Sequence, residues 1–173
     1  MADADRDMHT APLVSAGILL GVGLGGFADG IALHQILQWH NMLSSKLPPT
    51  NIVDLKVNMV WDWLFHALTW TVTIVGLGLL FRAGRRADVP WSGRVLVGSM
   101  LGGWGLFNLV EGLIDHQILG VHHVHPGSGE LAWDLAFLAS GLLLMGIGFT
   151  LVRRTSGRLP DAPLGRPIKA ARA

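Results

Sequence analysis

The stretch that decides the fold is DGIALHQILQWH at residues 29–40, because it occurs a second time as EGLIDHQILGVH at residues 111–122. Both copies read acid, Gly, three residues, His-Gln-Ile-Leu, two residues, His. We interpret the match as an internal duplication, and we expect it to carry the chemistry of the protein. The register between the copies is 82 positions, from 34 to 116, and it pairs these residues: Asp29 with Glu111, His34 with His116, and His40 with His122.

The composition is that of a membrane protein. Half of the 173 residues are hydrophobic, only 14% are charged, and the mean hydropathy is +0.45. Soluble domains carry about 25% charged residues. The apolar residues are gathered into runs of about 20, the length needed to cross the hydrocarbon core of a bilayer. The sequence therefore predicts an all-α polytopic protein whose partner is the lipid bilayer. A net charge of +1 gives no indication of nucleic-acid binding.

Four apolar runs predict four transmembrane helices within a domain that spans 11–152. They cover about 11–33, 51–81, 95–119 and 131–152. A polar leader (1–10) precedes them, and a basic tail (153–173) that we predict to be disordered follows. The leader lacks the basic region of a cleaved signal peptide, so we expect the first helix to be retained.

The duplication extends into the returning helices. Trp61-Asp62 followed by Phe65 matches Trp133-Asp134 followed by Phe137, with a shorter linker in the second copy. Repeat 1 thus covers about 11–81 and repeat 2 about 95–152. Because each repeat has two spans, both copies must share one orientation. We predict two parallel two-helix repeats.

The distribution of Lys and Arg predicts the orientation of these helices. The loop at 82–94 holds four Arg and the tail holds six basic residues, whereas the linker at 120–130 has none. Positively charged loops stay on the cytoplasmic side. Both termini are therefore expected in the cytoplasm, and the two His-containing linkers on the extracytoplasmic side.

This orientation gathers the ionisable residues of the helices at the extracytoplasmic end. A carboxylate exposed to lipid costs several kcal/mol, so such groups face the interior and pair with each other, a cation or a metal. The chain has no Cys, which leaves nitrogen and oxygen as ligand atoms. We predict a site for copper or zinc, ahead of iron. Its ligands would be Asp29, His34, Asp62, His66, Glu111, His116 and Asp134. Accessory ligands would be His40, His122, His123 and His125.

Helix geometry leaves one aspect of this site open. In a regular α-helix, at about 100° per residue, His34 points about 140° away from Asp29 and faces a different neighbour. Gly30 follows the acid and could mark a local unwinding that changes the angle. The same two alternatives hold for Glu111, Gly112 and His116.

The sequence leaves several other interpretations of these acids and histidines open. The acids and histidines could form structural hydrogen bonds between helices, or a metal-dependent hydrolase or oxidase could use the metal to activate water. His34 and His116 could hold a b-type haem, although haem requires an apolar pocket and this layer is rich in carboxylates. The Glu-x-x-His motif of ferritin-like di-iron sites is absent. The sequence is compatible with assembly as a homodimer.

Three segments carry a family resemblance: GFADGIALHQILQWHNM (26–42), WDWLFHA (61–67) and FNLVEGLIDHQILGVHHVHP (107–126). Together they resemble a family of small predicted bacterial membrane proteins that is classed as a domain of unknown function. The similarity covers about 11–153. It implies four helices in a bacterial inner (plasma) membrane, and it supplies no activity.

Overall fold

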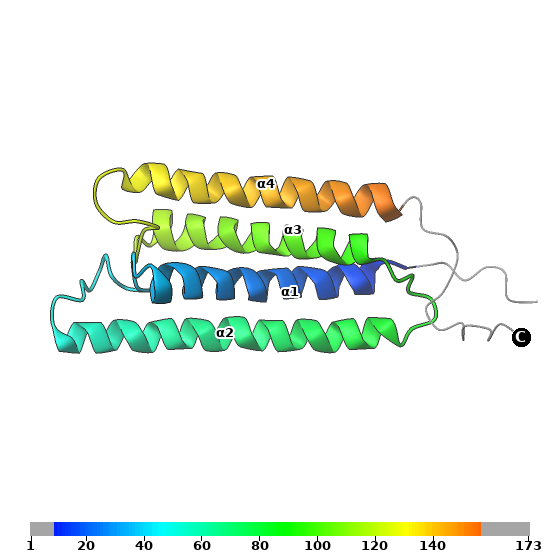
Figure 1. The fold of residues 1–173 in the computed structure, drawn as a ribbon, viewed down its shortest axis with the longest axis horizontal. Coiled ribbons are helices and arrows are strands. Elements are labelled where there is room, and N and C mark those ends of the chain that lie inside the picture. Colours follow the sequence, from blue (N-terminus) through cyan, green and yellow to red (C-terminus); the bar gives the residue numbers. More distant parts are fainter. Residues whose placement is uncertain (1–8, 157–173) are drawn as a thin grey trace, which may run out of the picture.

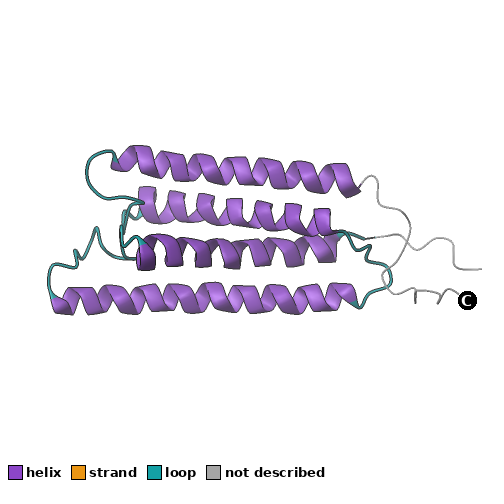
Figure 2. Cartoon of the chain, in the orientation of Figure 1, coloured by secondary structure: helices purple, strands orange, loops and turns teal. Residues whose placement is uncertain are grey.

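The computed structural model describes residues 9–156, and all regular structure in that range is helical (Figure 2). This confirms the predicted all-α class with four membrane-length helices. The helices are α1 (Ala11–Asp29), α2 (Ile52–Gly84), α3 (Gly93–Glu111) and α4 (Glu130–Ser156). Residues 1–8 of the predicted polar leader and 157–173 of the predicted disordered tail lie outside the described residues. Residues 153–156, which the sequence predicts as the start of the tail, are instead the last residues of α4.

Two of the helices end in a π-helical segment. α1 continues into η1 (Gly30–Ile36), and α3 continues into η2 (Gly112–Ile118). Each continuous unit is 26 residues long, which is enough to cross a bilayer. The two π segments begin at corresponding positions of the duplicated stretch, directly after Asp29 and Glu111.

The second helix is longer than a membrane requires. α2 has 33 residues, and at 1.5 Å per residue this is about 50 Å, against about 30 Å for the hydrocarbon core. Asn51 caps its first turn by accepting hydrogen bonds from the N–H groups of Val53 and Asp54. This end of α2 extends past α1 and α3 in Figure 1, so it can support the loop that follows η1.

The helices form an open row in the order α4, α3, α1, α2 rather than a closed bundle (Figure 1). Among the described helices, α2 packs on α1, α4 packs on α3, and the two outer helices do not contact each other. The outer helices expose large apolar side chains, such as Trp63 at 74% and Phe149 at 61%. Such surfaces are stable against lipid, and both copies of the duplicated stretch lie on the two central helices.

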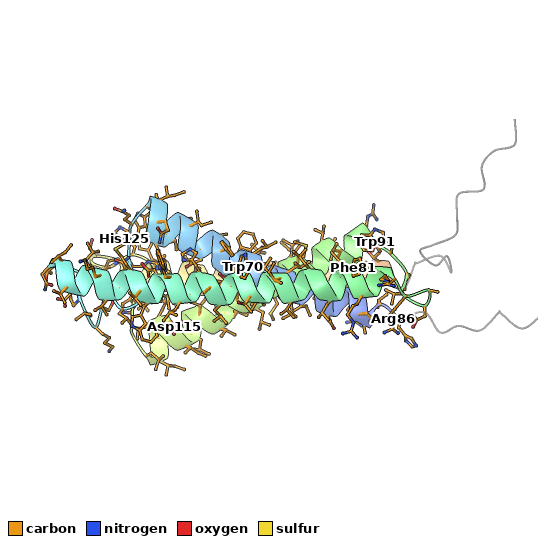
Figure 3. All side chains as sticks on the ribbon, turned by 90° about the horizontal axis from the view of Figure 1, so that it is seen from below. Trp70, Phe81, Arg86, Trp91, Asp115 and His125 are labelled. Atoms are coloured by element: carbon orange, nitrogen blue, oxygen red, sulfur yellow. The ribbon has the colours of Figure 1, made fainter. Side chains whose placement is uncertain are left out.

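The central helices run in the same direction and cross each other (Figure 3). Glycines make the crossing close. A Cβ added at Gly21 would collide with the backbone of Met100, and one at Gly103 with the backbone of Ile18. Small residues let membrane helices approach at such contacts. Beyond the crossing, α1 and α3 diverge toward the end that carries His125 and Asp115 in Figure 3.

The two ends of this row differ in character. Both ends of the described chain and the loop at 85–92 lie together, next to an apolar core of Leu13, Ala83, Val89 and Val95. The loops at 37–51 and 119–129 lie at the opposite end, where most of the buried groups are polar. The buried ionisable residues of the described chain therefore lie at one end. The parallel-repeat arrangement stays a prediction.

Candidate metal centre

The π segments decide which side chains face the site. In η1 the N–H of Leu37 donates to the carbonyl of Ala32, five residues back along the chain. A wider helical turn of this kind brings residues five apart onto one face, and such turns are frequent at functional sites. His34 Nε2 consequently lies 3.5 Å from Asp29 Oδ2. Of the two alternatives left by the sequence, the local unwinding after Gly30 is the one that the structure shows.

The glycines that open the π segments allow the outer helices to approach the site. A Cβ at Gly30 would lie 2.8 Å from His66 Nε2, and one at Gly112 would lie 2.9 Å from Leu138 Cδ2. Both distances are too short for a real side chain. Glycine therefore lets the side chains of α2 and α4 pack closely against the ends of the central helices, and a larger residue would have to displace His66 or Leu138.

A tight turn after each π segment returns the chain to the interior. Gln38, with φ of 51°, and Gly120, with φ of 54°, take the left-handed conformation at corresponding positions. This conformation is easy for glycine and unfavourable for other residues. The turn brings His40 and His122, which lie beyond the helices, between η1 and η2. The sequence suggested only an accessory role for these two residues.

Four buried imidazoles form a continuous group that we call the histidine cluster. Its ring centroids are 4.4 Å apart for His34 and His40, 4.7 Å for His40 and His122, and 4.8 Å for His122 and His116. Each side chain is at most 4% exposed. The cluster thus joins both copies of the duplicated stretch in one site.

In three of these rings, Nδ1 makes a hydrogen bond and Nε2 has no hydrogen-bond partner among the described residues. Nδ1 of His34 donates to Asp62 Oδ1 at 3.0 Å, while His40 and His122 donate to the backbone carbonyls of Val124 and Met42 at 2.8 and 3.1 Å. A carbonyl can only accept, so in His40 and His122 the Nδ1 atom carries the proton and Nε2 carries the lone pair. All three Nε2 atoms are buried without a hydrogen-bond partner among the described residues. Metal-binding histidines are oriented in this way.

Two carboxylates complete the set of free groups. Asp29 Oδ2 and both oxygens of Glu111 are buried and have no hydrogen-bond partner in the described part of the chain. Glu111 Oε1 lies 3.6 Å from His122 Nε2. Three trios of ligand atoms, each within 4.8 Å, therefore overlap. They are His34, His40 and His122; Glu111, His116 and His122; and Asp29, His34 and Glu111.

The two members of the histidine cluster that lie in the loops, His40 and His122, are neutral. Burial lowers the pKa of His40 to about 4, and the neighbouring His34 lowers it further. Burial also lowers the pKa of His122, to about 2, with the neighbouring His40 as the next cause. Both imidazoles are thus unprotonated near pH 7, which is the form that binds a metal ion.

Asp62 lies beside the cluster and has no free oxygen. Besides the bond from His34, it accepts hydrogen bonds from Asn41 Nδ2 at 2.7 Å and from the N–H of Met42 at 2.9 Å. The sequence predicts Asp62 as a ligand. Its observed contacts are those of a residue that orients His34 and fixes the loop after η1.

Asp134 makes the corresponding contacts in the second half of the chain. It accepts hydrogen bonds from His123 Nδ1 at 2.7 Å, from the N–H of Val124 at 3.0 Å and from Gln117 Nε2 at 3.1 Å. His116 Nδ1 lies 3.5 Å away. Met42 and Val124 occupy corresponding positions of the duplicated stretch, so both loops are anchored to the outer helices by equivalent bonds.

The remaining candidate histidines surround the cluster without joining it. His66 Nδ1 donates to the carbonyl of Asp62 at 2.7 Å. His123 lies 3.3 Å from Glu130 and also contacts Asp134. His125 packs against Trp39, with ring centroids 4.9 Å apart. The structure thus brings together four of the seven predicted ligands, Asp29, His34, Glu111 and His116, with the accessory pair His40 and His122.

A cavity opens beside His34, on the side of α2. Its volume is about 420 Å³, and its wall includes the amide side chains of Gln35, Gln38 and Asn41 as well as Asp62. The cavity is large enough for a small molecule and reaches one edge of the histidine cluster.

Comparison with known proteins agrees with the membrane fold. A family described as predicted membrane protein (DUF2243), whose function is unknown, matches residues 16–155. No curated protein matches the chain. No solved structure matches it either.

Proposed function

We propose that this chain, which belongs to the DUF2243 family of predicted membrane proteins, binds a transition-metal ion at the histidine cluster. The proposed ligands are the four imidazoles of the cluster with Asp29 and Glu111. Copper and zinc are favoured over iron because sites of nitrogen and oxygen ligands bind these two divalent ions more tightly than Fe(II). The observation that carries the proposal is the trio of His34, His40 and His122, whose Nδ1 atoms are held and whose Nε2 atoms have no hydrogen-bond partner among the described residues. The three rings offer ligand atoms within 4.8 Å of one another.

The distances between ligand atoms support an ion better than direct hydrogen bonds. His34 Nε2 and Asp29 Oδ2 are 3.5 Å apart, and His122 Nε2 and Glu111 Oε1 are 3.6 Å apart. Both distances exceed the usual limit of about 3.2 Å for a hydrogen bond. Two ligands at about 2.1 Å from a tetrahedral ion lie about 3.4 Å apart. Unpaired buried polar groups cost about 1–3 kcal/mol each, and a bound ion would remove this cost.

The same packing favours an ion over a b-type haem. A haem between two histidines requires a flat apolar space between their rings. His34 and His116 each lie beside other imidazoles of the cluster, at centroid distances of 4.4 and 4.8 Å, and beside carboxylates. Haem would therefore require these groups to move apart.

We place the site at the extracytoplasmic end of the helices in a bacterial plasma membrane. The support comes from charge: Arg82, Arg85, Arg86 and Arg94 lie at the opposite end, together with both ends of the described chain. Basic loops are retained in the cytoplasm.

The test is the metal content of detergent-purified protein after supplementation with copper or zinc. The double variant His40→Ala plus His122→Ala should lose the bound metal, whereas the control His125→Ala should keep it. His66→Ala should also keep it, which separates the ligand set seen in the structure from the set that the sequence predicts. Unchanged metal content in the double variant would overturn the proposal, and a Soret band in the optical spectrum would favour haem.

The cavity beside His34 favours a second candidate function, a metal-dependent enzyme. Such an enzyme needs an open ligand position next to a space for substrate. Azide added to the copper-loaded protein should then change its visible spectrum, because the anion can reach the metal through the cavity. A spectrum that azide leaves unchanged would contradict an open position and leave metal binding as the only proposal.

A further inference from the structure

We infer that the histidine cluster holds two metal ions, bridged by the carboxylate of Glu111. This inference rests on the proposed metal binding and goes beyond it by assigning the number of ions and the ligands of each. It follows from the spacing of the ligand atoms, from the environment of Glu111 and from the charge of the buried layer.

The ligand atoms are too widely spread for one ion. Atoms bound to the same ion at about 2.0–2.2 Å lie no more than about 4.4 Å apart. The six free side chains form three overlapping trios within 4.8 Å rather than a single group. Any one trio leaves three buried ligand residues without a partner. Two ions provide a partner for all of them.

Glu111 is the residue that both ions can share. It belongs to the trio with His116 and His122 and also to the trio with Asp29 and His34. Both of its oxygens are buried and without a hydrogen-bond partner among the described residues. A carboxylate with two free oxygens between two groups of ligands can bind one ion through each oxygen, as in centres whose ions lie about 3.5–4 Å apart.

The remaining ligands then divide evenly. One ion would take Asp29 and His34, which share a trio with Glu111. His40, which shares a trio with His34 but not with Asp29, would complete its ligands, and all three residues come from the first copy of the duplicated stretch. The other would take His116 and His122 from the second copy. Each half of the chain thus supplies two imidazoles to its own ion, and Glu111 joins the two halves.

The charge of the site also matches two divalent ions. Four carboxylates are buried in the described part of the chain: Asp29, Asp62, Glu111 and Asp134. When all four are ionised, these carboxylates repel one another and are costly in a membrane-embedded layer unless cations balance them. Two divalent ions supply four positive charges. A single divalent ion would leave two negative charges unbalanced.

The experiment is the molar ratio of copper to protein in the full-length, detergent-purified chain, measured by elemental and amino-acid analysis. A ratio of two supports the inference. A ratio of one overturns it and leaves the proposed function intact. A ratio of zero overturns both. In the two-copper protein, electron paramagnetic resonance should detect much less signal than two independent Cu(II) ions give, because a carboxylate bridge couples their spins.

Half-site variants make the test independent of any single residue. His34→Ala plus His40→Ala should retain one copper, and His116→Ala plus His122→Ala should also retain one. In each variant the remaining Cu(II) should give its full uncoupled signal. The acid at the edge of the site, Glu130, provides the control: Glu130→Gln should keep two. A half-site variant that still binds two coppers, or that binds none although the unmodified protein binds two, contradicts this division of the ligands.

Discussion

The imidazole of His34 shows how a single side chain is prepared to bind a ligand. Asp62 accepts the hydrogen bond from Nδ1 at 3.0 Å, which fixes the ring and leaves Nε2 facing Asp29 at 3.5 Å. The backbone carbonyls of Val124 and Met42 do the same for His40 and His122. A side chain whose polar atoms all have hydrogen-bond partners can orient a ligand, whereas one with an unpaired polar atom can itself bind a metal ion.

Asp62→Asn should therefore weaken metal binding without removing it. The amide is neutral and cannot accept all the hydrogen bonds that Asp62 accepts, so His34 loses part of its orientation. Loss of such a supporting group typically lowers metal affinity about 10- to 100-fold. Competition with a chelator measures the change. The control is Asp54→Asn at the outer end of α2, and equal affinities for the two variants would contradict the supporting role.

A second prediction at the residue scale concerns backbone strain. Gln38 has a φ of 51°, whereas Gly120 occupies the corresponding turn with a φ of 54°. A left-handed conformation costs a non-glycine residue about 1–2 kcal/mol, and glycine adds about 0.5–1 kcal/mol of entropy cost. Gln38→Gly should thus stabilise the protein by up to about 1 kcal/mol, and Gly120→Gln should destabilise it. Thermal unfolding in detergent tests both, and a lower melting temperature for Gln38→Gly would refute the strain.

At the scale of the element, the π segments set the register of the site. Their wider turns place His34 beside Asp29, and they begin at glycines that lie against the outer helices. An α-helix of ordinary pitch would rotate His34 away from the acid. The site thus depends on a local departure from the regular helix as much as on the residue types.

Gly30→Ala tests this dependence. The added Cβ would lie 2.8 Å from His66 Nε2 and 3.1 Å from Phe65 Cε1, so these side chains or the helices that carry them must shift. We expect a loss of stability of about 1–3 kcal/mol, as for other overpacked sites. Adding His66→Ala should recover part of it, because the closest contact is then removed. The four proteins of this cycle give the coupling energy from thermal unfolding, and strictly additive effects would contradict the contact.

The sequence was sufficient to predict the four helices, but it predicted only part of the candidate site. Four long apolar runs require four spans, because the bilayer allows few alternatives. The acids and histidines had to be buried for the same reason. The central position of His40 and His122 could not be read from helical periodicity, since it depends on the turns at Gln38 and Gly120. Nothing in the sequence indicates that Asp62 and Asp134 each accept three hydrogen bonds from the π segments and the loops.

At the scale of the whole molecule, the open row places the surface that faces lipid and the candidate site on different helices. α2 and α4 present apolar side chains outward, while α1 and α3 carry the duplicated stretch between them. The polar end is closed by the two loops whose carbonyls hold His40 and His122, each loop bonding the histidine of the other half. Neither half of the chain can therefore complete the histidine cluster alone.

The orientation of this row in the membrane decides which compartment the site faces. Arg86 lies at one end of the molecule and His125 at the other (Figure 3). The chain has no Cys, so a single introduced thiol is a specific label site. We choose Ala87→Cys beside the arginines and Ser128→Cys in the loop that carries His125. Both positions are exposed.

A membrane-impermeant maleimide added to intact cells should label Ser128→Cys and leave Ala87→Cys unlabelled until the cells are lysed. The physical reason is that the basic loop resists transfer across the membrane. Labelling of Ala87→Cys alone in intact cells would invert the proposed orientation while leaving the metal centre itself unaffected. Because the histidine cluster lies at the Ser128 end, the labelled position also decides from which side of the membrane the metal ions must arrive.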